Sequence, residues 1–165
     1  MAVQILTDKQ VEQKIRRLAY QIYENNFDQK SVALVGIRAM GFFLAKAMKD
    51  ILQEISHLEV DLISLDLNKA QPLSSPVNLS APIERLANQN IILVDDVLNS
   101  GKTMFYALHP FFGIPIRKLQ TLVLVNRDYK NFPINPDYVG YSLATTLQNH
   151  VLVVLDKEEK GLFLN

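Results

Sequence analysis

The segment that most constrains the fold of this chain is residues 91–103, which read Ile-Ile-Leu-Val-Asp-Asp-Val-Leu-Asn-Ser-Gly-Lys-Thr. Its apolar start predicts a buried strand over Asn90–Val94. The glycine-containing turn that follows predicts the start of a helix, which we expect to continue to about Phe112. A buried strand that turns directly into a helix is the repeating unit of α/β sheets. The segment therefore predicts an α/β fold.

The rest of the chain alternates helices and strands in the same way. Thr7 and Gln10 have the spacing of a capping box, and an apolar stripe at helical spacing continues from there to about Asn26. The stripe consists of Val11, Ile15, Leu18 and Ile22. A second helix is expected from about Gly41. Further strands are expected over residues 31–35, 59–65, 118–125, 138–144 and 151–155, with Gly36 ending the first of them. We therefore expect one domain, residues 1–165, in which helices flank a central, mainly parallel sheet with right-handed crossovers.

Composition narrows the classes of function. Lys plus Arg and Asp plus Glu number 17 each, which argues against a chain-wide basic surface for nucleic acid. The chain has no cysteine, so disulfides, thiolate catalysis and zinc–thiolate sites are excluded, and its three histidines have no metal-ligand spacing. The first residues lack the pattern of a secretory signal, and no apolar run approaches the ~18 residues that span a bilayer. We therefore expect a cytoplasmic protein with no metal site of its own and no membrane partner.

Residues 95–103 carry the strongest chemical signal. Asp95 and Asp96 are expected at the exposed end of the strand, where neighbouring carboxylates repel each other unless a ligand compensates them. The two adjacent hydroxyls of a ribose can do so. The turn that follows opens a helix whose N–H groups favour a phosphate, and Gly101 permits close approach. The residues expected on the phosphate side are Val97, Leu98, Asn99, Ser100, Gly101, Lys102 and Thr103. Together these features match a ribose 5-phosphate.

One other interpretation of this segment stays open, and a second one fails. Asp96 and Asn99 can be the turn and capping residues of an ordinary strand-to-helix junction. A P-loop is the rival phosphate site, but it needs a glycine five positions before Gly101, where this chain has Asp96. The P-loop is therefore excluded by its own spacing.

Two more segments are expected at the same edge of the sheet, because ligands bind beyond the carboxyl ends of parallel strands. Backbone N–H groups around Ile37–Met40 can bind an anion there, and Arg38 is either a cation for the ligand or a solvated surface charge. Arg127 either contacts the ligand or pairs with Asp128 at the surface. The one long loop, residues 66–82, is also a candidate for function.

The whole of residues 91–103 resembles the signature of type I phosphoribosyltransferases for 5-phosphoribosyl-1-pyrophosphate (PRPP). The resemblance covers nearly the full chain. It is closest to the bacterial pyrimidine operon attenuation proteins, which also act as uracil phosphoribosyltransferases. The further segments that carry it are Ile5–Asp8, Leu34–Arg38, Gly41–Lys46, Leu122–Arg127 and Asp137–Gly140. It implies a parallel sheet with a small hood over the base.

The resemblance also implies roles for single residues. Asp95 and Asp96 hold the ribose hydroxyls, the loop Asn99–Thr103 holds the 5-phosphate, and Arg38 joins the two aspartates in catalysis. The pyrophosphate loop contributes Ile37, Arg38, Ala39 and Met40. The base-binding end contributes Arg127 and Val151. The implied ligands are PRPP with Mg²⁺, uracil or another nucleobase, UMP and pyrophosphate, and the implied assembly is a homo-oligomer.

Two departures from the family pattern bear on catalysis. Ala39–Met40 stands where the family usually carries Thr-Arg, and Asp66–Ala70 stands where the family has an Arg-Asp-Asp cluster in a longer mobile loop. The departure of pyrophosphate builds negative charge that cations must stabilise. Arg38 and Lys69 can supply part of that positive charge.

The attenuation proteins also bind messenger RNA, partly through their first helix. Here the basic side of that helix consists of Lys9, Lys14, Arg16 and Arg17. Tyr20 stands at the place of a family histidine, and Asp128–Lys130 is less positive than the family's basic loop, so a solvated helix face is favoured.

The leading function is therefore transfer of ribose 5-phosphate from PRPP to a nucleobase, with uracil as the expected base. The alternatives are a nucleotide-responsive RNA-binding regulator with weak or no transferase activity, and a ligand-binding or assembly protein that keeps only the PRPP pocket.

Overall fold

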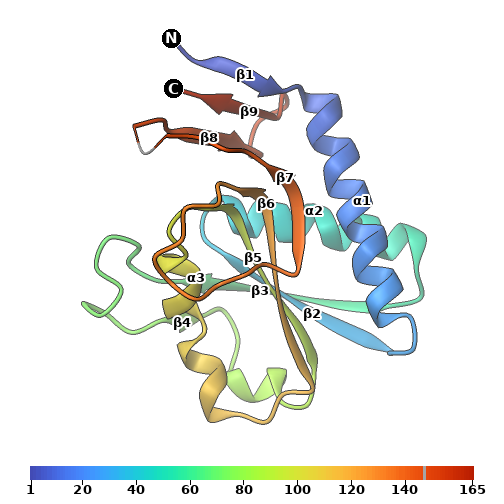
Figure 1. The fold of residues 1–165 in the computed structure, drawn as a ribbon. Helices are drawn as coiled ribbons and strands as arrows, with labels where there is room; N and C mark the ends of the chain where they lie inside the picture. Colours follow the sequence, from blue (N-terminus) through green and yellow to red (C-terminus); the bar gives the residue numbers. More distant parts are fainter. Residues whose placement is uncertain (147) are drawn as a thin grey trace.

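The computed structural model describes residues 1–146 and 148–165, and a six-stranded sheet forms the body of the molecule (Figure 1). The strand order is β4-β3-β2-β5-β6-β7, and every neighbouring pair is parallel except β3 and β4. The strands are β2 (Ser31–Ile37), β3 (Glu59–Asp66), β4 (Asn78–Leu79), β5 (Asn90–Leu98), β6 (Lys118–Asn126) and β7 (Tyr138–Ser142). The expected central, mainly parallel sheet is therefore confirmed.

Helices cover both faces of this sheet. They are α1 (Asp8–Asn26), α2 (Met40–Ile55) and α3 (Lys102–Ala107), with two short 3₁₀ helices, η1 (Ile83–Leu86) and η2 (His109–Gly113). The apolar sides of α1 and α2 form one core cluster with sheet residues such as Leu34 and Val94. α3, η1 and η2 contribute to a second cluster, which contains Val35 and Leu93 from the opposite face of the same strands. The sheet is therefore buried on both sides, as a parallel sheet requires.

α1 begins as the sequence predicts. The Thr7 hydroxyl accepts a hydrogen bond from the Gln10 backbone N–H at 3.3 Å, and the Gln10 side-chain oxygen accepts one from the Thr7 N–H at 2.9 Å. All four residues of the predicted apolar stripe are buried. The capping box and the stripe are therefore confirmed, and the helix ends at Asn26 as expected.

A second, three-stranded sheet forms a hood above the body of the molecule (Figure 1). Its strands are β1 (Val3–Leu6), β8 (Val151–Val154) and β9 (Gly161–Leu164), and β9 lies between the other two with antiparallel pairing. Val153 and Leu162 anchor the hood in the core cluster that α1 and α2 share. The sequence predicted β8, which is rich in β-branched valine, but not the equally short β1 and β9, which contain Gln4 and Gly161.

β2 continues through Gly36 to Ile37, so the prediction that Gly36 ends this strand is wrong. Gly36 pairs with Ser64 of β3 and with Val94 of β5. A Cβ atom at this position would lie 2.6 Å from the Cα atom of Phe42 in α2. Glycine is therefore needed because α2 packs directly on the strand, not because the strand stops.

The segment 91–103 folds into a longer strand than the sequence predicts, and the helix after it is shorter. β5 extends beyond Val94 to Leu98, because its last part still pairs with β6. α3 ends at Ala107, and the 3₁₀ helix η2 follows it. Pro110 has no N–H to donate to the carbonyl four residues earlier, so the α-helix cannot continue.

No helix in residues 1–146 and 148–165 combines the length and the apolarity that a membrane span needs.

Candidate active site

The acidic pair lies inside β5 rather than after it. β5 pairs with β2 only as far as Gly36 and Val94, whereas its pairing with β6 continues to Leu98. The last part of β5 therefore extends past the end of β2 and forms one wall of a cleft at the carboxyl ends of the strands. The prediction that Asp95 stands at an exposed strand end is wrong: Asp95 is only 3% exposed, and Asp96 is half-buried.

Asp95 is held between three neighbours. The Asp96 backbone N–H donates a hydrogen bond to Asp95 Oδ1 at 2.9 Å, and Lys69 Nζ lies 3.6 Å from the same oxygen. A Cβ atom at Gly41, in the first turn of α2, would lie 3.1 Å from Asp95 Oδ1 and 2.7 Å from the Val94 carbonyl oxygen. Gly41 therefore allows the start of α2 to approach the acidic pair.

Burial decides the charge state that Asp95 prefers. Desolvation raises the pKa of Asp95 well above its ordinary value, and the neighbouring Asp96 raises it further, while Lys69 acts in the opposite direction. A ligand that donates hydrogen bonds to this carboxylate would offset part of the desolvation. The acidic pair is thus suited to bind hydroxyl groups, as the sequence suggested.

The turn between β5 and α3 encloses a small hollow. It has a volume of about 40 Å³, which exceeds the ~10–15 Å³ that one water molecule needs. The lining residues are Asp95, Val97, Leu98, Asn99, Ser100, Gly101, Lys102, Thr103 and Met104. Gly101 has a φ of 88°, a left-handed conformation that favours glycine. The structure therefore brings all the predicted phosphate-side residues to one hollow. We call residues 99–103, which line part of this hollow, the phosphate loop.

The loop after β2 lies at the same end of the sheet. The Arg38 backbone N–H donates to the Leu65 carbonyl at 2.9 Å, and the peptide bond between Arg38 and Ala39 is cis. Arg38 and Ala39 are exposed, and Met40 starts α2. Within the described residues the Arg38 guanidinium makes no hydrogen bond or ion pair, so it is available to an anionic ligand.

The long loop between β3 and β4 reaches the acidic pair. Besides the contact of Lys69 with Asp95, Lys102 Nζ of the phosphate loop donates to the Ala70 carbonyl oxygen at 3.4 Å. The sequence suggested Lys69 as a supplementary cation, and the structure places it at the carboxylates.

Arg127 is buried, and this was not foreseen. Only 5% of the residue is exposed, and its guanidinium donates hydrogen bonds to protein groups on several loops. The suggested surface pair with Asp128 is wrong, because the Asp128 carboxylate lies 3.9 Å from Lys130 Nζ instead. Val151 opens β8 of the hood, and β8 contacts β5. No sequence pattern indicates the hydrogen bonds of Arg127, because the residues that accept them are spread over about fifty residues of the chain.

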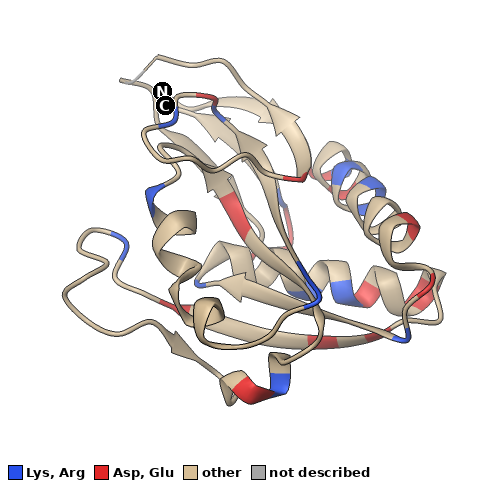
Figure 2. Ribbon diagram, turned by 60° about the horizontal axis from the view of Figure 1, so that its bottom comes forward, with Lys and Arg blue, Asp and Glu red and all other residues tan. Residues whose placement is uncertain are grey.

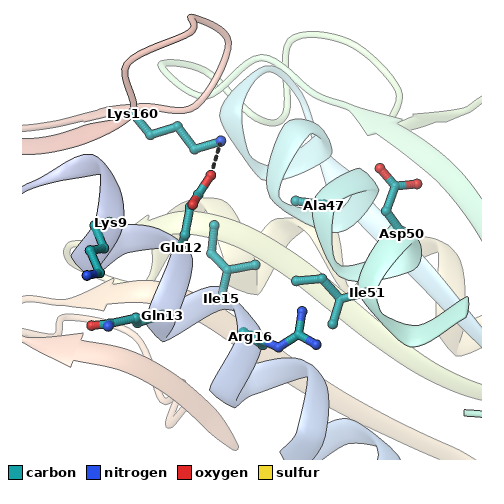
Figure 3. A pocket seen from close by; sticks show the side chains of 9 residues that line it. All are labelled: Lys9, Glu12, Gln13, Ile15, Arg16, Ala47, Asp50, Ile51 and Lys160. Carbon is teal, nitrogen blue, oxygen red and sulfur yellow. Dashed lines mark hydrogen bonds and ion pairs between the residues drawn. The ribbon is translucent and has the colours of Figure 1, made fainter. Parts of the chain in front are cut away.

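A larger hollow lies away from this cleft, between α1 and α2 (Figure 3). Its volume is about 510 Å³, and Ile15, Ala47 and Ile51 give it an apolar floor. Two of its basic residues are paired within the protein: Lys160 Nζ lies 3.0 Å from Glu12 Oε1 and Arg16 Nη2 lies 2.9 Å from Glu54 Oε1. Because it lacks the convergent acids and the glycine turn of the strand ends, we assign the chemistry to the smaller cleft.

Comparison with known proteins agrees with this geometry. The sequence model of the phosphoribosyl transferase domain matches residues 1–156. The bifunctional protein PyrR of Streptococcus pneumoniae is 31% identical over 165 residues, which cover 96% of this chain and 95% of that protein.

Solved structures share the fold at lower identity. A hypoxanthine phosphoribosyltransferase from Trypanosoma cruzi has a TM-score of 0.75 and 17% identity, with 95% of this chain and 89% of that chain covered. A hypoxanthine-guanine phosphoribosyltransferase from Bacillus anthracis has a TM-score of 0.70 and 18% identity, with 87% and 83% covered. At this identity the likeness concerns the fold alone.

Proposed function

This chain belongs to the phosphoribosyl transferase domain family, and from that premise we propose that it transfers ribose 5-phosphate from PRPP to uracil, which yields UMP and pyrophosphate. The observation that carries the proposal is the pairing of a buried carboxylate, Asp95, with a glycine-based phosphate loop on the same strand end. The carboxylate suits ribose hydroxyls and the loop suits a phosphate, and both line the same hollow.

The proposed roles follow from the chemistry of each group. Asp95 and Asp96 accept hydrogen bonds from the two ribose hydroxyls, and the N–H and hydroxyl groups of the phosphate loop donate to the 5-phosphate. During transfer the bond from ribose C1 to the pyrophosphate oxygen breaks, a bond from C1 to the base nitrogen forms, and the base releases its proton. Negative charge grows on the departing pyrophosphate, where the Arg38 guanidinium and the N–H groups of Ala39 and Met40 stabilise it.

Magnesium is proposed to arrive with PRPP. No group of three acidic or histidine side chains in residues 1–146 and 148–165 is placed to hold a metal ion. Two neighbouring carboxylates suit Mg²⁺, which keeps water and takes substrate phosphate oxygens as ligands. When bound, the ion neutralises pyrophosphate charge.

Uracil is proposed on the strength of the whole-chain likeness to the pyrimidine operon proteins. The hypoxanthine and hypoxanthine-guanine phosphoribosyltransferases share the fold at 17–18% identity, which carries no argument about the base. A cytoplasmic location and a homo-oligomer stay predictions.

The test is a base screen with PRPP and magnesium in which pyrophosphate release and nucleotide product are both measured. We expect UMP from uracil and no product from hypoxanthine, guanine or cytosine. The control is Asp95→Asn combined with Asp96→Asn, which should bind no PRPP while it stays folded. A purine nucleotide as the only product would overturn the choice of base. PRPP binding without turnover on any base would favour a nucleotide sensor.

A further inference from the structure

The guanidinium of Arg127 is saturated by protein acceptors. Nε donates to Thr145 Oγ1 at 2.8 Å, and Nη2 donates to the carbonyl oxygens of Thr146 at 3.0 Å and Asn149 at 2.8 Å. Nη1 donates to Asn99 Oδ1 at 2.8 Å and to the Tyr129 hydroxyl at 3.2 Å. All five N–H donors of the arginine are therefore used, and none is left for a substrate.

The acceptors belong to two segments that are far apart in the sequence. Asn99 lines the hollow of the phosphate loop. Residues 143–146 and 148–150, which we call the base-side segment, connect β7 to the hood strand β8. The base-side segment has few backbone hydrogen bonds of its own, such as Leu143 N–H to Asn126 O and Asn149 N–H to Thr146 O.

We propose that Arg127 is a positioning residue that ties the phosphate loop to the base-side segment and so fixes the distance between these two segments. The inference rests on the proposed function for the roles of the two segments, but the bridge itself is a property of the free protein. Arg127 does not touch the substrate; it acts through Asn99 on one side and through Thr145, Thr146 and Asn149 on the other.

Only an arginine can fill this position. Its planar group presents five donors in a fixed fork, whereas a lysine has three donors on one atom and cannot reach acceptors on opposite sides. The Tyr129 ring, whose centroid lies 4.8 Å from the guanidinium carbon, adds a cation–π contact. The positive charge is buried without a carboxylate partner in the described residues, so these dipoles and the ring must compensate for its desolvation.

The first experiment measures amide hydrogen exchange of the free protein. In Arg127→Met the base-side segment should exchange at least roughly tenfold faster than in the wild type, since hydrogen bonds to a charged group are lost, and Arg127→Lys should lie between the two. Asn99→Ala, at the far end of the bridge, should also speed exchange of the base-side segment, but not in the Arg127→Met background. Arg85→Met, which removes an ion pair with Asp61 on β3, is the matched control and should leave the segment unchanged.

The second experiment measures transfer by the same variants. Arg127→Met should raise the KM of the base by about tenfold, kcat should fall less, and Arg127→Lys should restore part of the loss. Unchanged exchange in a folded Arg127→Met protein would overturn the bridge. Faster exchange with an unchanged KM would overturn its role in positioning. If Arg127→Met does not fold, hydrogen exchange of the base-side segment in Asn99→Ala and Arg127→Lys tests the bridge instead. A wild type that binds no PRPP would instead refute the proposed function, and hydrogen exchange would still decide on the bridge.

Discussion

At the scale of single residues, Asp95 is the group on which charge, burial and ligand chemistry meet. Burial and Asp96 both favour its protonated form, whereas Lys69 favours the ionised form. The sequence predicted that Asp95 and residues 99–103 lie at one site, because these residue types are specific and nearly contiguous, and the structure places them around one hollow. The sequence misjudged the exposure of Asp95 and the surroundings of Arg127, because burial depends on how far β5 extends and on loops that are distant in sequence.

The raised pKa of Asp95 predicts how stability depends on pH. The folded protein binds this proton more tightly than the unfolded chain, so the proton stabilises the fold at low pH and its contribution is lost as pH rises through the raised pKa. In Asp95→Asn this loss should disappear, and melting temperatures measured between about pH 4 and 8 should fall less than in the wild type. Asp128→Asn, at a side chain that is 79% exposed, is the control and should follow the wild type. Identical curves for Asp95→Asn and the wild type would contradict the assignment.

Gly101 gives a second prediction at this scale. A valine would have to adopt a φ of 88°, and its Cβ atom would lie 3.4 Å from the Cβ atoms of Phe132 and Ile134. Gly101→Val should cost roughly 1–3 kcal/mol of stability and should weaken PRPP and UMP binding alike, because both ligands carry a 5-phosphate. Calorimetry measures both affinities. Gly113→Val is the matched control, since a Cβ atom there meets nothing within 4 Å. Normal UMP affinity in a folded Gly101→Val protein would place the phosphate elsewhere.

At the scale of elements, the prediction succeeded where periodicity is long and failed for several short elements. α1 has a capping box and an apolar stripe, and both were read correctly. β1, β4 and β9 have two to four residues each and were missed, whereas the equally short β8 was predicted because three of its four residues are valine. The length of β5 follows from its pairing with β6, which is a tertiary contact.

The start of α2 yields a prediction that concerns two elements together. An alanine at Gly41 would place its Cβ atom 2.7 Å from the Val94 carbonyl oxygen of β5, so the helix must move away from the strand. Gly41→Ala should therefore lower stability by about 1–3 kcal/mol and also reduce PRPP affinity, because Asp95 lies at that contact. Thermal melting and calorimetry measure the two effects. Asp50→Ala, at an exposed position on the same helix, should change neither. Full PRPP affinity in Gly41→Ala would show that the contact does not shape the site.

At the scale of the whole molecule, both basic and acidic residues lie along α1 and along α2 (Figure 2). Most cations of α1 are also engaged: Arg16 pairs with Glu54, Arg17 donates to the Val139 and Gly140 carbonyls, and Lys14 lies over the Tyr141 ring. These contacts argue against the RNA-binding alternative, because RNA affinity rests on cations that neutralise phosphates.

RNA binding is therefore expected to be weak. The slope of log affinity against log salt for a single-stranded RNA should be no steeper than about −1.4, the value for two neutralised phosphates. Glu54→Gln, which frees Arg16, should steepen the slope by about 0.7, and Asp128→Asn, away from α1, is the charge-matched control. Mobility shifts at several salt concentrations measure both slopes. If the affinity of the wild type for RNA falls steeply with salt, the RNA-binding regulator becomes the better hypothesis.

The hood has a consequence for the order in which the molecule is built. β1 and β9 pair with each other although nearly the whole chain lies between them, so their pairing closes the largest loop in the protein. Such a closure costs much chain entropy and slows folding, whereas the partners of β5, which are β2 and β6, lie much closer to it in the sequence. We therefore expect β5 and the phosphate loop to fold first and the hood to fold last. A growing chain would hold a formed phosphate loop well before it could enclose a base.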